Sequence, residues 1–276
     1  MAGRRPLAPN PAGAHFLRDR ALIAQLVRGC GARDGRLVLD LGAGGGAITT
    51  ALAATGARVI AVEHDPRLAA RLQRRFDADP RVRVVHADLR TVPLPRRDFL
   101  VVASPPFALT TALCRRLLGD PAVPLAGAEL ILQQGAARWL ASPRPRDAET
   151  AWWAARYELR LARTVSPDSF VPPPGVDAAR LTIRPRAITR HPAAQHRLRA
   201  LLRAAYRRPY ARADAVLAAL PAALPAARPR AGPGARPGGR QARRLLIKAG
   251  IDPAAPATQL TARQWHRLAM GLSDPR

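Results

Sequence analysis

The sequence predicts an α/β protein in which a parallel sheet with crossover helices is followed by a smaller, basic, helical part. Two observations predict this fold class. Residues 1–179 alternate short apolar runs with helical patterns, as βαβ units do. From Arg180 onward the chain is helical wherever it has a periodicity, as in "HRLRALLRAAY" and "ATQLTARQWHRLAMGL". We therefore expect one domain over residues 1–186 and a second over residues 187–276.

Charge is the strongest compositional feature of the chain. Its 276 residues carry a net charge of +26, with a pI near 11.9, and such an excess favours a polyanionic partner, most often nucleic acid. From Arg180 to the end there are 20 basic and 3 acidic residues. This part includes a Pro/Gly/Arg-rich stretch at about 225–243, which we predict to be a mobile basic segment that contacts RNA. A solvated tail without RNA contact is the alternative.

Cysteine usage and hydropathy indicate the cellular environment. Cys30 and Cys114 are too few for a disulfide framework and lack metal-type spacing, which predicts a reducing compartment and no metal site. No apolar run reaches the length of a membrane span, and "MAGRRPLAPNPAGAHFL" lacks the apolar core of a signal peptide. We expect a soluble, cytoplasmic, monomeric protein with no membrane partner.

The first candidate site is the stretch "RLVLDLGAGGGAITTALAATG". Residues 37–41 predict a buried strand, and a turn with Gly42 and Gly44 leads to a helix from about Ala47. Glycines permit a tight turn and let backbone N–H groups approach a ligand. Such a turn could serve NAD, FAD or a nucleoside, or could be an ordinary tight turn. Asp40 precedes the first glycine, and this pattern favours S-adenosylmethionine, with the acid facing the cationic methionine end.

The next two predicted strands end in carboxylates. "ARVIAVEHD" ends at Glu63, where a carboxylate can accept both ribose hydroxyls of a nucleoside. "RVRVVHADLR" ends near Asp88, which suits the adenine amino group, with Leu89 against the ring. His64 is a cofactor candidate beside Glu63, although a turn role explains it as well. Either acid alone could cap a helix, but their order at successive strand ends favours a nucleoside-binding crevice.

The fourth predicted strand, "DFLVVASPPF", ends in a motif suited to methylating an exocyclic base amine. The lone pair of such a nitrogen is delocalised into the ring, so the nitrogen is a poor nucleophile. The Ser104 hydroxyl and the Pro105 carbonyl can accept hydrogen bonds from its N–H groups. These bonds favour a more pyramidal and therefore more reactive nitrogen. Phe107 offers a face on which an extruded base can stack. The structural alternative is a strand-to-loop turn with a phenylalanine in the core.

In this order the motifs resemble those of the ribosomal RNA adenine-N6 methyltransferases. The resemblance is carried by "HFL" at 15–17, the glycine turn, Glu63, Asp88, "SPPF" and "FVPPPGVDAA" at 170–179. It covers about residues 10–186 well and the basic remainder more loosely. The Pro-Pro-Phe form and the Arg-rich tail are most similar to Erm-type macrolide-resistance enzymes of high-GC actinobacteria.

The resemblance implies a Rossmann-like S-adenosylmethionine-dependent methyltransferase domain with a small helical C-terminal domain. It also implies N6-methylation of an adenine in 23S rRNA, and hence resistance to macrolides, lincosamides and streptogramin B. Two other classes stay open. One is a small-subunit rRNA dimethyladenosine transferase or a DNA methyltransferase, and the other is a non-catalytic RNA-binding relative.

Two positions depart from the family pattern. Ala14-His15 stands where the family usually has Gln-Asn, and Ser104 stands where it usually has Asn. His15 can still make one hydrogen bond, and serine occurs in this motif among exocyclic-amine methyltransferases. The catalytic candidates are Ser104, Pro105 and Phe107. The cofactor candidates are His15, Leu17, Asp40, Gly42, Gly44, Glu63, His64, Asp88, Leu89 and Ser104.

Overall fold

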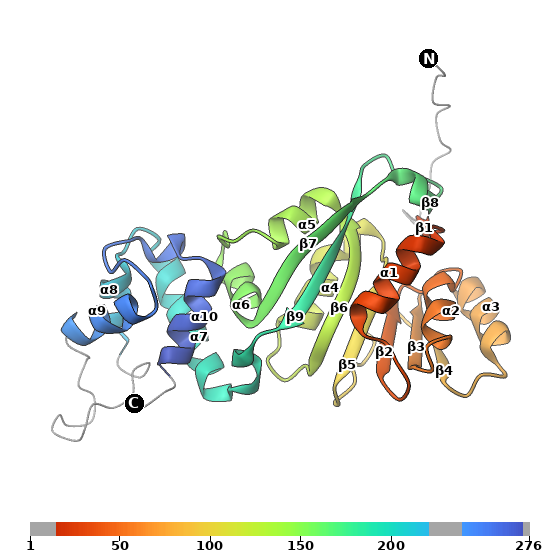
Figure 1. The fold of residues 1–276 in the computed structure, drawn as a ribbon, viewed down its shortest axis with the longest axis horizontal. Helices are drawn as coiled ribbons and strands as arrows, with labels where there is room; N and C mark the ends of the chain where they lie inside the picture. The colour runs from red at the N-terminus through yellow and green to blue at the C-terminus, as the bar shows by residue number, and fades with distance from the viewer. Residues whose placement is uncertain (1–14, 221–238, 273–276) are drawn as a thin grey trace, which may run out of the picture. The chain divides into compact units, whose positions relative to one another are not determined.

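The computed structural model describes residues 15–220 and 239–272, and the chain divides into two compact units. The first unit extends to Trp139 and resumes over Arg160–Arg184, and the second comprises Leu140–Leu159 and the chain from Pro185 onward. Figure 1 shows the sheet in the first unit and helices in the second. Residues 140–159, which lie within the predicted domain 1–186, belong to the second unit in the structure.

A seven-stranded sheet forms the centre of the first unit. Its strands are β2 (Leu37–Leu41), β3 (Arg58–Glu63), β4 (Val82–His86), β5 (Phe99–Ala103), β6 (Leu125–Gln133), β7 (Tyr157–Val165) and β9 (Ala178–Pro185). They are arranged in the order β4-β3-β2-β5-β6-β9-β7. The pairs from β4 through β6 are parallel, which confirms the predicted α/β class, whereas β9 runs antiparallel to β6. The sequence analysis did not predict β6, β7 or β9.

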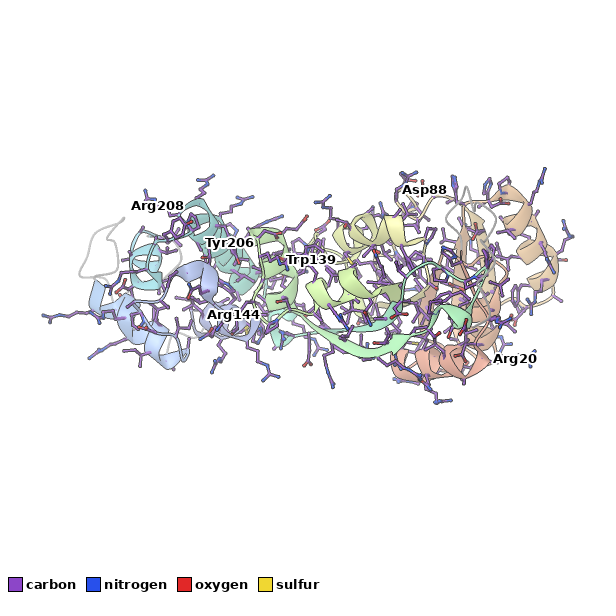
Figure 2. The ribbon with its side chains drawn as sticks, turned by 90° about the horizontal axis from the view of Figure 1, so that it is seen from above. Arg20, Asp88, Trp139, Arg144, Tyr206 and Arg208 are labelled. Atoms are coloured by element: carbon purple, nitrogen blue, oxygen red, sulfur yellow. The ribbon has the colours of Figure 1, made fainter. Side chains whose placement is uncertain are left out.

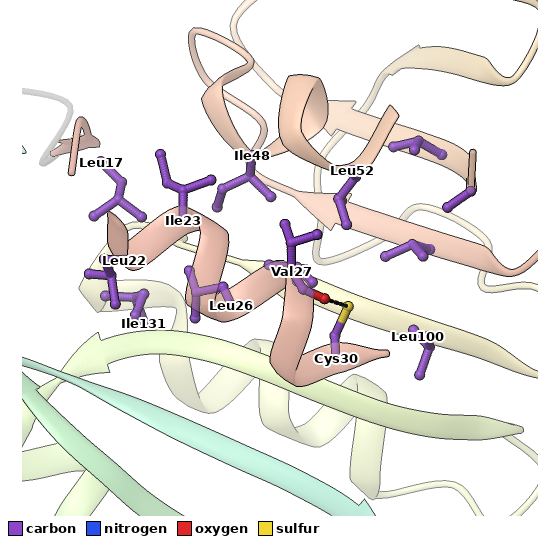
Figure 3. Close-up of a cluster of buried hydrophobic side chains, with 14 of the residues drawn as sticks. Leu17, Leu22, Ile23, Leu26, Val27, Cys30, Ile48, Leu52, Leu100 and Ile131 are labelled. Atoms are coloured by element: carbon purple, nitrogen blue, oxygen red, sulfur yellow. Dashed lines mark hydrogen bonds between the residues drawn. The ribbon is translucent and has the colours of Figure 1, made fainter. Parts of the chain in front are cut away.

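Helices cover this sheet, and a small two-stranded sheet lies beside it. The elements are α1 (Arg20–Cys30), α2 (Ala47–Ala53), α3 (Pro66–Phe76), α4 (Thr110–Leu118), α5 (Gln134–Leu140), and the antiparallel pair β1 (Phe16–Leu17) and β8 (Phe170–Val171). The Asp19 side chain caps α1 by accepting the N–H of Leu22. Figure 3 shows the apolar side chains of α1 gathered with Ile48 of α2 and Ile131 of β6 in one buried cluster.

The second unit is built from α6 (Ala148–Arg156), α7 (Pro192–Arg207), α8 (Ala213–Ala218), α9 (Gly239–Lys248) and α10 (Ala262–Gly271). Trp153 of α6 and Trp265 of α10 are buried in it, and α6 packs on α7 and α10. This burial explains why residues 140–159 join the second unit. The predicted helices at 196–206 and 257–272 lie in α7 and α10, but α10 begins later than predicted because Thr261 caps it.

The predicted mobile segment at about 225–243 lies outside the described residues over positions 225–238, as does Ala14. Residues 239–243 instead begin helix α9. Ala242 and Leu246, four residues apart, are the buried residues on one side of this helix. Their packing stabilises a helix although the local sequence is rich in glycine and arginine. None of the helices in residues 15–220 and 239–272 has the length and apolarity that crossing a bilayer demands.

Candidate active site

A cavity of about 730 Å³ lies in the first unit, where β2, β3, β4 and β5 end. Parallel strands bring their carboxyl ends to one edge of a sheet, so motifs far apart in the sequence meet there. The volume is in the range of small-molecule binding sites. The predicted residues that line the cavity are His15, Leu17, Gly42, Gly44, Glu63, His64, Asp88, Leu89 and Ser104.

The turn between β2 and α2 depends on glycines in the left-handed region. Gly44 has a φ of +55°, and a Cβ there would lie 2.8 Å from the ring of Phe16. Gly46 precedes α2 with a φ of +80°, and its Cβ would lie 2.5 Å from Leu72. A larger residue at Gly44 would strain the backbone and push Phe16, which lines the cavity, out of place.

Glu63 holds this turn from the end of β3. Its Oε2 accepts the N–H of Gly44 at 2.7 Å and its Oε1 accepts the N–H of Asp65 at 2.8 Å. Each carboxylate oxygen has a further lone pair, so Glu63 can still accept hydrogen bonds from a ligand in the cavity. Asp65 caps α3 by accepting the N–H groups of Arg67 and Leu68, as expected for a turn residue.

Asp88, labelled in Figure 2, follows β4 and is held by the residue two positions after it. Its Oδ1 accepts the backbone N–H of Arg90 at 2.7 Å, and its Oδ2 accepts Nε of the same residue at 2.8 Å. Hydrogen bonds from the Arg90 side chain lower the pKa of Asp88 to about 2, so its carboxyl group is ionised at neutral pH. Arg90 also lines the cavity, and the sequence analysis missed it.

Asp40 does not line the cavity, in contrast to the prediction that it faces a ligand. It is fully buried because β2 lies inside the sheet and α2 packs on it. Its Oδ2 accepts the hydroxyl of Thr49 at 2.6 Å, and its Oδ1 has no hydrogen-bond partner among the described residues. Burial raises the pKa of Asp40 to about 7, against the lowering effect of the Thr49 bond.

Ser104 is the first residue after β5 and lies half-buried at the cavity wall. Its hydroxyl makes no hydrogen bond to the described part of the chain, so it is available to a ligand. Pro105 is buried and does not line the cavity, whereas Pro106 of the same "SPPF" motif does. The chain then turns into a short 3-10 segment, Phe107–Leu109, that leads into α4.

Phe107 is half-buried and is absent from the cavity wall. Its ring centroid lies 6.0 Å from that of His15 and 6.4 Å from that of Phe170, which it meets edge to face at 82°. The Nδ1 of His15 donates to the carbonyl of Pro172 at 2.8 Å. Phe107 therefore belongs to an aromatic cluster with His15 and Phe170, and because the residue is only half-buried, part of it remains accessible to a ligand.

The described residues, 15–220 and 239–272, contain no group of three or more His, Cys, Asp or Glu side chains that could hold a metal ion. The site combines carboxylates at two strand ends, a glycine turn, and a hydroxyl at a third strand end. This donor set fits a nucleoside with a cationic or polar tail.

Residues 10–212 match the family model described as "Ribosomal RNA adenine dimethylase". The chain is 38% identical over 187 residues to the mycinamicin-resistance protein MyrB of Micromonospora griseorubida, covering 68% of this chain and 57% of that protein. It is 36% identical over 184 residues to the ribosomal RNA small subunit methyltransferase A of a Synechococcus strain, covering 63% and 66%. The chain thus spans about three fifths of the length of the curated relatives it matches.

The crystal structure of the 23S rRNA methyltransferase ErmE is similar over nearly the whole chain. The TM-score is 0.74 at 27% sequence identity, and the similarity covers 94% of this chain and 100% of that one. The predicted α/β fold with a Rossmann-like sheet is therefore confirmed.

Proposed function

The chain belongs to the ribosomal RNA adenine dimethylase family, and we propose from this membership that it methylates N6 of an adenine in 23S rRNA, with S-adenosylmethionine as the methyl donor. The observation that carries the proposal is the meeting of Glu63, Asp88 and Ser104 at one cavity. Similarity to ErmE and to MyrB favours 23S rRNA as the substrate and macrolide-type resistance as the result. A ribosomal substrate implies a cytoplasmic enzyme.

The cavity residues fit this cofactor. S-adenosylmethionine supplies, when bound, a methyl group activated by a positively charged sulfur. We assign Glu63 to the ribose hydroxyls, Asp88 to the adenine amino group and Leu89 to the adenine ring. The unpaired, buried Oδ1 of Asp40 lies behind the glycine turn and supplies negative charge there when ionised, which suits the cationic methionine end.

Ser104, Pro105 and Phe107 act on the target adenine in this proposal. The Ser104 hydroxyl and the Pro105 carbonyl accept hydrogen bonds from the N–H groups of the amine. Phe107 stacks on the extruded base. On transfer, N6 would bond to the methyl carbon as the sulfur–methyl bond breaks, the sulfur would leave as a neutral thioether, and N6 would release one proton to solvent and stay neutral. Holding the amine near the methyl group provides much of the rate enhancement.

Primer extension on rRNA from cells that express the protein tests the proposal. We expect a new stop or modification signal in 23S rRNA, absent from 16S rRNA and weaker with the Phe107→Ala variant. Drug susceptibility of the same cells gives a second measurement, with macrolide tolerance expected only for the active protein. Expression without any change in 23S rRNA would contradict the proposal.

Small-subunit rRNA is the second candidate substrate, because the chain is 36% identical to a small-subunit enzyme over 184 residues. A modification that appears in 16S rRNA instead of 23S rRNA would favour it. The third candidate is a non-catalytic RNA-binding relative, which would not need to bind S-adenosylmethionine. Calorimetry with S-adenosylmethionine separates this class, since the cavity described above predicts binding.

A further inference from the structure

Helix α3 carries three arginines on the face that points away from the sheet. Arg67, Arg71 and Arg74 follow the spacing i, i+4, i+7, so they lie along one side of the helix. Ala69 and Leu72 form the buried side, which lies opposite on the helical wheel. All three arginine side chains are exposed. We call these three residues the α3 stripe.

No residue of the α3 stripe forms a salt bridge within the described parts of the chain. Other exposed arginines of the first unit do, such as Arg81 with Asp79 at 3.0 Å. The acidic residue nearest in sequence is Asp65, and its carboxylate caps the helix by accepting backbone N–H groups. Asp65 also interacts electrostatically with Arg67, whereas Arg71 and Arg74 have no ion-pair partner among the described residues, so most of the positive charge of the stripe is unpaired.

The stripe begins at the cavity. Asp65, Pro66 and Leu68, at the start of α3, all line the cavity, and Arg67 lies between them in sequence. At a rise of 1.5 Å per residue, the stripe extends about 10 Å along the helix from that point. In α4, by contrast, Arg116 donates to the carbonyls of Arg90 and Val92, and α2 contains no arginine.

We propose that the α3 stripe binds the phosphate backbone of the rRNA that flanks the methylated adenine. This inference rests on the proposed function, which brings an RNA chain to the cavity. Unpaired arginines beside the cavity are complementary to a polyanion, and phosphate contacts fix the register of a nucleic acid without reading its sequence. The catalytic unit then holds RNA itself, in addition to the basic C-terminal third that the sequence singled out.

A charge-matched pair of variants tests this proposal. The stripe variant replaces Arg67, Arg71 and Arg74 with Gln, which is nearly as good a helix former as arginine. The control variant replaces three exposed arginines with Gln at positions that lie outside α3 and do not line the cavity. These control positions are Arg28, Arg33 and Arg58.

Fluorescence anisotropy with a transcript of the 23S peptidyl-transferase region measures RNA affinity between about 50 and 300 mM KCl. We expect the stripe variant to lose affinity by about tenfold or more at low salt. The slope of log affinity against log salt should fall by about 2, which is three contacts at about 0.7 each for single-stranded RNA. The control variant should keep a slope close to that of the wild-type protein.

Two further measurements separate the possible failures. Affinity for S-adenosylmethionine, measured by calorimetry, should match the wild-type value in both variants, because neither removes a cavity residue assigned to the cofactor. Equal RNA losses in the two variants, or no loss in the stripe variant, would overturn the stripe proposal. If the wild-type protein methylates neither rRNA, the proposed function fails, while the difference in RNA affinity between the two variants still decides whether the stripe binds RNA.

Discussion

Glu63 has two roles at the residue scale, because one carboxylate supports the glycine turn through Gly44 and also lines the cavity. In the Glu63→Ala variant the ribose hydroxyls would lose a charged acceptor. We expect the binding free energy of S-adenosylmethionine to weaken by about 1.5–3 kcal/mol, the range for charge-assisted hydrogen bonds. Isothermal titration calorimetry measures this change directly.

Asp65→Asn is the matched control for that experiment. It also removes a carboxylate beside the cavity, but asparagine caps a helix about as well as aspartate does. Cofactor affinity should stay within about twofold of the wild-type value. An unchanged affinity in Glu63→Ala would refute the assignment of the ribose to Glu63.

Ser104 determines the expected product. A serine hydroxyl is shorter than an asparagine amide by about one bond, and loss of about one neutral hydrogen bond, 0.5–1.5 kcal/mol, slows transfer roughly threefold to tenfold. A monomethylated amine is bulkier and has one N–H left, so a second transfer is harder. We expect mainly monomethyladenine, with a larger dimethyl share for Ser104→Asn. Mass spectrometry of nuclease-digested 23S rRNA measures both products, and predominant dimethyladenine from the wild-type protein would refute this interpretation.

Phe107→Ala should reduce methylation more than Ser104→Ala. Stacking on an aromatic ring contributes about 1–3 kcal/mol per base, whereas the hydroxyl contributes about one neutral hydrogen bond. Phe107 also packs on Phe170 and His15, so thermal unfolding must be measured beside activity. Phe107→Tyr keeps the ring and is the control. A Phe107→Ala enzyme as active as Ser104→Ala would show that the ring does not hold the base.

Helix α9 allows a prediction at the scale of one element. Arg240, Arg243 and Arg244 are exposed, while Ala242 and Leu246 bury the other side of the helix. Replacing the three arginines with Ala keeps the helix propensity and should flatten the dependence of log RNA affinity on log salt by about 2. Binding titrations over a salt series measure this slope. An unchanged slope would show that α9 does not contact RNA. Arg236, in the basic stretch at about 225–243 that the sequence predicts to contact RNA, lies outside the described residues.

The pH dependence of unfolding is a property of the whole molecule, and Asp40 should contribute to it. Burial raises the pKa of Asp40 from 3.8 to about 7 in the folded chain. The folded state thus binds this proton more tightly than the unfolded state. The resulting stabilisation is complete below about pH 4 and is lost as pH rises through about 7. The free energy of unfolding of the wild-type protein, relative to Asp40→Asn, should therefore fall between about pH 4 and pH 7.

Urea unfolding at a series of pH values measures that difference. Asp98→Asn, at an exposed carboxylate just before β5, is the control and should give a curve parallel to that of the wild-type protein. Parallel curves for Asp40→Asn and the wild-type protein would show that Asp40 titrates normally in the folded chain.

The sequence by itself determined the α/β class, the strands that carry the motifs and nine of the residues that line the cavity. Residues 37–41 are an apolar run followed by glycines, and such a pattern is local, so it predicts a strand and a turn without knowledge of the rest of the chain. Glu63 and Asp88 could be placed together because parallel strands end at a common edge.

Only the tertiary structure decided which side chains face the cavity and which unit holds residues 140–159. Asp40 belongs to the same motif as Gly42, yet it is buried against Thr49, and Phe107 packs on Phe170 from a distant part of the chain. These outcomes depend on packing between segments far apart in sequence, for which local periodicity carries no signal. The antiparallel strand β9 is likewise chosen by its pairing with β6, since a strand's direction in a sheet is set by the path of the chain and not by its own residues.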